Sequence, residues 1–441
     1  MTQQSLEDAA QRIVELAREL GAEEATARVS RSAWTELQRR DGKVEKAQES
    51  RSLSAGASLM VDGRFSSHST SDLRPDALRA FLERAVAATR FLEPDPDRRL
   101  PDLADMGRSD APLDPHDPSW ADVQPDDRRA LVESLESHCT EGAKAVPTRS
   151  LSTYAWDGAS DSALVTSHGF SSQWNSTSFG VGASINLEDE GGKLPEAWTS
   201  FQTQHREDLP DVSHVAADLI DRGTKRLGSG PAQSGRFPML LDSRVVGSLL
   251  RVLMGPLSGG AIHEKRSCLA DKLGEKIAST SFTLRDNPLI PRGLGSQPHD
   301  GDGLPSVPRT IVEDGVLKMF FVSVYNGRRL GVPTTTGGAS NLVIDPGTDS
   351  PDALMAAHPI AIRVDGFLGG NTNPSTGDFS FGIQGALLEH GKPTRALSEM
   401  NVSGDLFGLM QRYVAAANDP WTFGSWRTPS LVFDDIQFSG A

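Results

Sequence analysis

The chain has 441 residues, and 44 Lys and Arg against 59 Asp and Glu give it a net charge of −15. This acidity argues against a nucleic-acid groove, which needs a basic surface to displace counterions, and against binding to an anionic membrane surface. The start of the chain has no basic segment followed by an apolar run, and no stretch is long and apolar enough to cross a bilayer. Two cysteines are too few for a disulfide framework, so we expect a cytoplasmic protein.

The first half of the sequence, residues 1–227, predicts an α+β domain with antiparallel sheets. Amphipathic periodicity predicts helices over residues 5–20, 75–89, 126–139 and 212–227. Extended segments are predicted over 25–37, 43–46, 56–61, 64–69 and, as a further sheet, 151–201. Asp41-Gly42 and Asp62-Gly63 stand between extended segments and indicate tight hairpins, because both central turn residues need positive φ. A Pro- and Asp-rich stretch, 93–117, predicts an irregular connector and a sub-boundary near residues 93–124.

The Gly- and Pro-containing stretch 228–231 is the expected boundary to a second domain, residues 232–441. Helices are predicted there over 243–254, 261–277 and 406–417. Strands are predicted over 237–241, 311–313, 316–321 and 431–438, and around the alternating residues 379–383. Strands and helices do not alternate regularly along the chain, so the fold class is α+β.

One segment, His263 to Cys268, resembles a metal-binding motif. Zinc peptidases place two ligands on one helix with a Glu beside the first, which deprotonates a zinc-bound water. Here Glu264 follows His263, but Cys268 lies five residues on, which leaves the two side chains about 140° apart on an ideal helix. They converge only if the helix breaks between them, so a polar helix start with one buried cysteine remains the simpler interpretation. His299, Asp300 and Asp302 lie in a Gly- and Pro-rich segment and favour a solvated turn over a metal site.

Several longer strings resemble the TldD/PmbA family, at spacings that extend over nearly the whole chain. In the first half they are Asp41-Gly42-Lys43-Val44-Glu45 and Val61-Asp62-Gly63-Arg64. In the second half they are Gly259-Gly260-Ala261, residues 285–296, Asp314 to Lys318, Gly337 to Asn341, Thr376 to Gly382, and Ser403 to Leu406.

The resemblance implies an N-terminal α+β domain and a C-terminal domain of antiparallel, barrel-like sheet with packed helices. It also implies a cytoplasmic metallopeptidase assembled as a dimer, which cleaves unfolded peptides or matures peptide natural products. In heterodimeric members, the TldD type carries a His-Glu-x-x-x-His zinc motif completed by a cysteine near the C-terminus, and the PmbA (TldE) type lacks this site.

The match to that zinc motif is partial. His263 and Glu264 fall on its His and Glu, Cys268 stands where the second His is expected, and no thiol occurs around residues 424–426. Catalytic zinc usually needs three protein ligands. The remaining strings are closer to the PmbA type.

Three hypotheses follow from these residues. In the first, the chain is a PmbA-like subunit without a complete zinc site, and its partner, a TldD-type homologue, supplies the zinc for a peptide substrate. In the second, the chain is an independent zinc metallohydrolase with His263 and Cys268 as ligands and Glu264 as the catalytic base. In the third, it is a non-proteolytic interaction protein resembling a gyrase modulator. The sequence leaves homodimer and heterodimer open.

Overall fold

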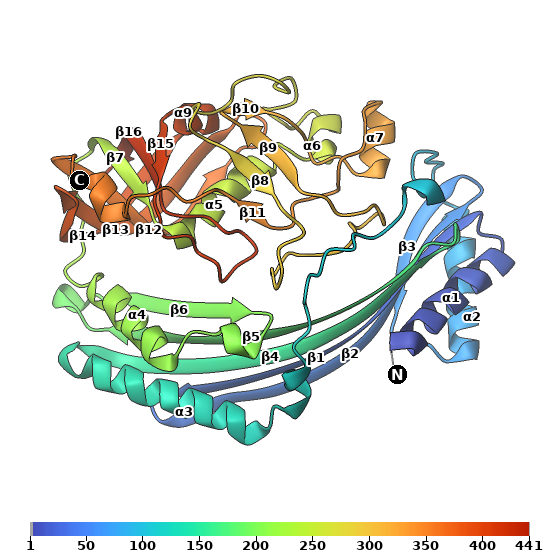
Figure 1. The fold of residues 1–441 in the computed structure, drawn as a ribbon, viewed down its shortest axis with the longest axis horizontal. Coiled ribbons are helices and arrows are strands. Elements are labelled where there is room, and N and C mark those ends of the chain that lie inside the picture. The colour runs from blue at the N-terminus through green and yellow to red at the C-terminus, as the bar shows by residue number, and fades with distance from the viewer. Residues whose placement is uncertain (1–2, 441) are drawn as a thin grey trace.

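The computed structural model describes residues 3–440, and its N-terminal half is built on one long, curved antiparallel sheet (Figure 1). The strand order is β3-β2-β1-β4-β5-β6. The strands are β1 (Glu24–Arg40), β2 (Lys43–Val61), β3 (Arg64–Thr70), β4 (Thr148–Thr166), β5 (Ser171–Leu187) and β6 (Glu196–Thr203). Four of them are 17 to 19 residues long, so the two ends of the sheet pack against different pairs of helices.

The predicted Asp-Gly hairpins are confirmed. Asp41 and Gly42 have φ of 48° and 81°, and Asp62 and Gly63 have φ of 50° and 70°, as such turns require. The segments predicted separately over 43–46 and 56–61 are parts of one strand, β2, because the polar residues between them continue the ladder with β1.

Four helices cover the convex side of this sheet: α1 (Gln3–Glu19), α2 (Pro75–Thr89), α3 (Pro125–Gly142) and α4 (Val212–Thr224). Odd-numbered strand residues such as Ala27, Leu59 and Val181 are buried beneath the helices. Because strand side chains alternate, the even-numbered residues face the concave side, over which the C-terminal half lies (Figure 1).

Short 3₁₀ helices punctuate the connections of this half. They cover Leu103–Asp105, Pro118–Asp122, Ala143–Ala145, Glu190–Gly192 and Arg206–Asp208. Apart from the first of these, residues 96–117 are irregular, as the Pro- and Asp-rich composition predicts.

The C-terminal half contains a barrel of five strands: β7 (Gly235–Leu241), β12 (Ile360–Thr372), β13 (Asp378–Glu389), β14 (Lys392–Asp405) and β16 (Leu431–Ser439). Pairing of β14 with β16, through Asn401 with Ser439 and Val402 with Phe438, closes the ring. The barrel-like α+β architecture is therefore confirmed, with one correction. The β12–β7 pair is parallel, because the chain from β7 to β12 passes through all the intervening elements instead of a tight turn.

A smaller sheet of order β10-β9-β8-β11 lies beside the barrel, built from β8 (Leu284–Asp286), β9 (Arg309–Glu313), β10 (Val316–Leu317) and β11 (Leu342–Val343). The helices of this half are α5 (Ser243–Met254), α6 (Gly259–His263), α7 (Val324–Leu330), α8 (Pro351–Met355) and α9 (Leu406–Gln411). The strand predicted over 316–321 is wrong beyond Leu317, after which the chain leaves the ladder.

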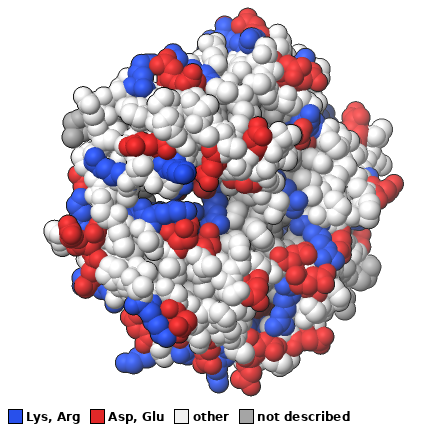
Figure 2. All heavy atoms as spheres, turned by 60° about the vertical axis from the view of Figure 1, so that its left-hand side comes forward, with Lys and Arg blue, Asp and Glu red and all other residues white. Residues whose placement is uncertain are grey.

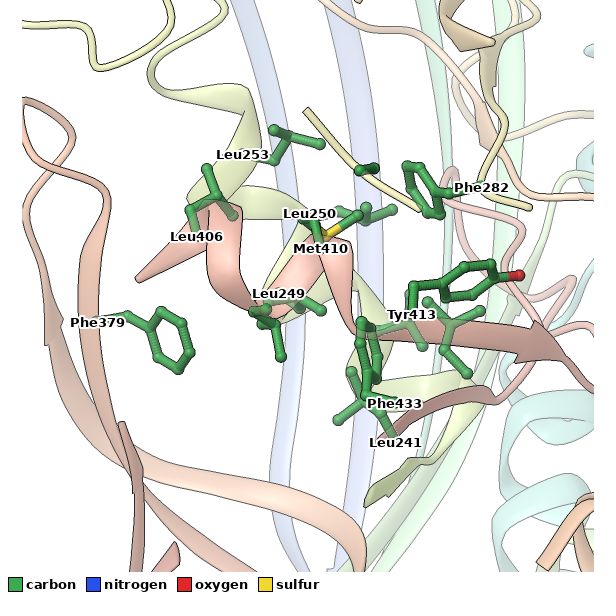
Figure 3. Close-up of a cluster of buried hydrophobic side chains, with 14 of the residues drawn as sticks. Leu241, Leu249, Leu250, Leu253, Phe282, Phe379, Leu406, Met410, Tyr413 and Phe433 are labelled. Atoms are coloured by element: carbon green, nitrogen blue, oxygen red, sulfur yellow. The ribbon is translucent and has the colours of Figure 1, made fainter. Parts of the chain in front are cut away.

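The core of this half forms where α5 and α9 meet the barrel strands (Figure 3). Leu249 and Leu250 of α5 lie against Met410 of α9 and the ring of Phe433. The predicted helix over 406–417 is wrong beyond Gln411, because β15 (Tyr413–Ala416) pairs with β16 instead. The rings of Tyr413 and Phe282 pack with their centroids 5.2 Å apart, and this packing favours the strand over the helix.

Across residues 3–440, no helix combines the length and the apolar character needed to cross a bilayer.

Candidate functional site

The segment that resembles a zinc motif begins on α6 and leaves the helix immediately after it. The Ser258 hydroxyl caps α6 by accepting from the Ala261 amide at 3.1 Å. The helix ends at His263, and Lys265 then takes a left-handed φ of 56°. The helix predicted over 261–277 is therefore wrong beyond His263, since a left-handed non-Gly residue cannot continue an α-helix.

His263 ends the helix with one ring nitrogen, Nδ1, buried and without a hydrogen-bond partner among the described residues. Glu264, in contrast, is exposed and forms an ion pair with Arg266, whose Nε lies 2.8 Å from its carboxylate. The hydrogen bond and charge of Arg266 lower the pKa of Glu264. Its carboxylate is thus occupied by a neighbouring cation, which opposes proton abstraction from a water.

Cys268 lies beyond the turn, against the barrel core. Its backbone amide donates to the Pro374 carbonyl at 2.9 Å, and a Cβ built on Gly377 would lie 3.4 Å from its sulfur. Burial, together with the charge of Asp378, raises the pKa of the Cys268 thiol. A raised pKa disfavours the thiolate form, which is the form that binds zinc.

These three residues do not fit a zinc ion. Lys265 and Arg266 add two positive charges beside the motif, Glu264 forms an ion pair with Arg266, and burial disfavours the thiolate of Cys268. Within residues 3–440, no group of three or more His, Cys, Asp or Glu side chains is placed to hold a metal. The break that the spacing requires does occur, but it does not produce a three-ligand set.

The loop of His299 is buried rather than solvated, contrary to our expectation. His299 Nε2 lies 2.9 Å from the Ser172 hydroxyl on the concave face of the sheet. The Asp300 carboxylate accepts from the amides of Asp302 and Leu304, both at 3.0 Å. Burial lowers the pKa of His299. This loop of the barrel half therefore contacts the sheet through the hydrogen bond between His299 and Ser172.

Two of the strings that carry the family resemblance, residues 285–296 and 337–341, meet through polar side chains. Asp286 accepts from both the amide and the hydroxyl of Ser340 at 2.7 Å. The Asn341 amide donates to the Ser296 hydroxyl at 2.9 Å, and its oxygen accepts from the Gly295 amide at 2.9 Å. Because each of these polar groups is hydrogen-bonded to a residue of the other string, the two strings support the fold.

The concave face of the sheet carries aromatic side chains that the sequence reading missed. Trp34 stacks on Trp156 with ring centroids 6.1 Å apart, and Trp156 stacks on Tyr154 at 5.9 Å. A Cβ on Gly180 would lie 2.0 Å from the Trp156 ring, and one on Gly182 would lie 2.6 Å from Tyr154. The rings therefore lie flat on the sheet over glycines. The sequence does indicate this arrangement, because these aromatic residues and glycines all occupy even-numbered strand positions and therefore share one face of the sheet.

Comparison with known proteins identifies the family to which this chain belongs. Models of the PmbA/TldA metallopeptidase match domain 1 at residues 25–89, the central domain at 118–227 and the C-terminal domain at 234–440. The chain belongs to the PmbA/TldD metallopeptidase family. The metalloprotease PmbA of Escherichia coli O157:H7 is 26% identical over 441 residues, which is 99% of this chain and 96% of that protein.

Solved structures agree with this assignment. A "putative modulator of DNA gyrase" from Bacteroides thetaiotaomicron is 34% identical with a TM-score of 0.95, over 98% of both chains. TldE from Thermococcus kodakarensis is 19% identical with a TM-score of 0.86, over 98% of this chain and all of that one, and therefore shares the fold. This chain is a PmbA-like member of a metalloprotease family.

Proposed function

We propose that this chain is a PmbA-type (TldE-type) subunit of a two-component metallopeptidase and that the catalytic zinc belongs to a TldD-type homologue. The proposal rests on the ion pairing of Glu264 and the burial of Cys268, two residues of the zinc-like motif. Glu264 is paired with Arg266, and Cys268 is a half-buried thiol beyond the end of α6. Zinc peptidase chemistry needs a general base and usually three protein ligands, and an ion-paired carboxylate and a thiol of raised pKa suit these roles poorly.

In this proposal the chain contributes a docking surface for an extended, unfolded peptide. The concave face of the sheet supports it, because the half-buried rings of Trp34, Tyr154 and Trp156 offer flat apolar area. Serines 160, 162 and 178 on the same face offer hydrogen-bond groups that do not select one side chain. Such a surface suits unfolded peptides or precursors of peptide natural products, which can lie across the rings and hydrogen-bond to the serine hydroxyls.

The test is reconstitution. The full chain purified alone is expected to hold far less than one zinc per chain by elemental analysis and to leave an unstructured fluorogenic peptide intact. Mixed with a homologue that carries His-Glu-x-x-x-His, it should form a stable complex by size-exclusion chromatography, and the mixture should cleave the peptide faster than the homologue alone.

Stoichiometric zinc together with peptidase activity in the isolated chain would overturn the proposal in favour of an independent metallohydrolase. Failure to bind any such homologue, with no gain in cleavage, would favour the non-proteolytic interaction protein.

A further inference from the structure

A cleft of ≈ 150 Å³ lies between helix α4 and the barrel strands β12 and β13. It is lined mainly by charged side chains and is called here the arginine cleft after Arg222 and Arg226, which lie at the end of α4 and in the turn after it. On the face turned forward in Figure 2, basic and acidic side chains surround a hollow between the two halves of the molecule. The cleft is large compared with the roughly 30 Å³ that one water occupies.

Three cations of the arginine cleft have carboxylate partners. Arg244 makes a two-pronged ion pair with Asp218, at 2.7 and 2.9 Å. Arg363 pairs in the same way with Asp365, at 2.7 and 3.1 Å. Lys225, on the rim, pairs with Asp221 one turn earlier. These charges are matched within the protein.

Arg222 and Arg226 are different, since neither forms an ion pair within residues 3–440. Arg226 donates to the amide oxygen of Gln384 on β13, a neutral partner. Arg222 has its Nε buried with no hydrogen-bond partner. Burial, and then repulsion from Arg222, lower the pKa of Arg226. Arg226 interacts at longer range with the charges of Asp365 and Glu196. Arg222 interacts in the same way with those of Asp218 and Asp242. Among the described residues, however, neither guanidinium has a carboxylate within ion-pair distance to serve as a matching anion.

The remaining carboxylate does not supply that anion. Asp242 caps α5 by accepting from the Arg244 amide at 3.0 Å. Burial, and then the charge of Asp365, raise the pKa of Asp242, which favours its neutral form. Even with Asp242 ionised, the five Arg and Lys side chains that line the cleft outnumber its four Asp side chains, and guanidinium groups without a carboxylate partner favour an anionic ligand.

We propose that the arginine cleft binds an oxyanion, a carboxylate or a phosphate, between the guanidinium groups of Arg222 and Arg226. A guanidinium presents its N–H groups as a planar fork that matches the two oxygens of either anion. Arg222 and Arg226 belong to the sheet half, and Gln384 and Arg363 belong to the barrel half. A bound anion therefore connects the two halves, and it stabilises the folded chain because the unfolded chain has no such site.

The test titrates the full chain with glutarate and, separately, with inorganic phosphate, in chloride buffer of constant ionic strength. Calorimetry gives the Kd, and thermal unfolding gives the shift in Tm. Either anion is expected to bind saturably and to raise Tm. Arg222→Gln and Arg226→Gln should each weaken binding by about tenfold or more, since a hydrogen bond to a charged group contributes roughly 1.5–3 kcal/mol.

The control is Lys144→Gln, which removes the same charge from an exposed side chain outside the cleft lining, and it should change the Kd less than about twofold because long-range charge effects are screened. Arg226→Lys keeps the charge and provides a second variant if Arg226→Gln does not fold; it should weaken binding less than Gln does. Saturation with glutarate only identifies a carboxylate ligand, and saturation with phosphate only identifies a phosphate. If neither anion saturates, or if Lys144→Gln weakens binding as much as Arg226→Gln, the proposal is wrong.

Discussion

The loop from His263 to Cys268 and the arginine cleft both gather chemically active side chains, but they satisfy them differently. In the loop, Glu264 is exposed and its charge is cancelled by Arg266 two residues away. In the cleft, two guanidinium groups are enclosed by two halves of the chain, and neither has a carboxylate partner among the described residues. A recognisable motif and an unmatched set of charges are therefore separate signs of function, and here they occur in different places.

The largest expected effect comes from disturbing the matched part of the cleft. Asp218→Asn removes the partner of Arg244, and the two side chains are only 18% and 22% exposed. Breaking a largely buried pair leaves an uncompensated charge, so we expect a loss of about 3 kcal/mol in the free energy of unfolding. Urea unfolding followed by tryptophan fluorescence measures it. Asp221→Asn removes a carboxylate that is 56% exposed and should cost less than about 0.5 kcal/mol. Equal losses would contradict the difference in burial.

The same pair makes a pH-dependent contribution. Burial alone would raise the pKa of Asp218, but its hydrogen bonds and charge interaction with Arg244 outweigh burial and hold the pKa below its ordinary value of 3.8. A carboxylate with a lowered folded-state pKa stabilises the protein above the unfolded-state pKa and loses that contribution as the pH falls through the folded-state value. The stability difference between wild type and Asp218→Asn should therefore be full at pH 7 and shrink below about pH 4. A difference that does not vary between pH 7 and pH 3 would be inconsistent with this linkage.

The two regions also differ in what the sequence could reveal. The Asp-Gly hairpins and the helices of the sheet half follow from local chemistry, because turn geometry and amphipathic periodicity involve residues near in sequence. The helices predicted over 261–277 and 406–417 were too long, because the residues after each helix end contact residues that are distant in the sequence. Cys268 hydrogen-bonds to Pro374, and Tyr413 packs on Phe282. Tertiary contacts of this kind override local helix propensity.

The candidate sites follow the same rule. His263, Glu264 and Cys268 could be named from their order in the sequence, but the pairing of Glu264 and the protonation of Cys268 depend on the turn and on burial. The arginine cleft could not be predicted, since Arg222 lies more than a hundred residues before Arg363 and Gln384, and only the fold brings α4 to the barrel. Isolated arginines on a helix carry no sequence signature of an enclosed site.

A smaller effect is expected when the motif itself is restored. Cys268→His gives the chain the His-Glu-x-x-x-His spacing, yet residue 268 lies past the left-handed Lys265 and beside the barrel core. We expect zinc to stay well below one per chain by elemental analysis, because a third ligand is missing and two cations flank the motif. Cys268→Ser serves as the control for the loss of the thiol. Stoichiometric zinc in Cys268→His alone would show that the spacing, and not the surrounding charges, limits metal binding.

The smallest effect is expected at Glu264. In an active zinc peptidase this position supplies the general base, and its replacement by Gln, which keeps the size but cannot take a proton, lowers kcat by orders of magnitude. Here the carboxylate is exposed and bound to Arg266, so Glu264→Gln in the reconstituted pair should leave kcat and KM within about twofold of wild type. The matched comparison is the same substitution at the motif Glu of the zinc-bearing homologue, which should abolish cleavage. If Glu264→Gln slows cleavage as much as the substitution in the partner, then this loop takes part in the chemistry, and the contrast between it and the arginine cleft does not hold.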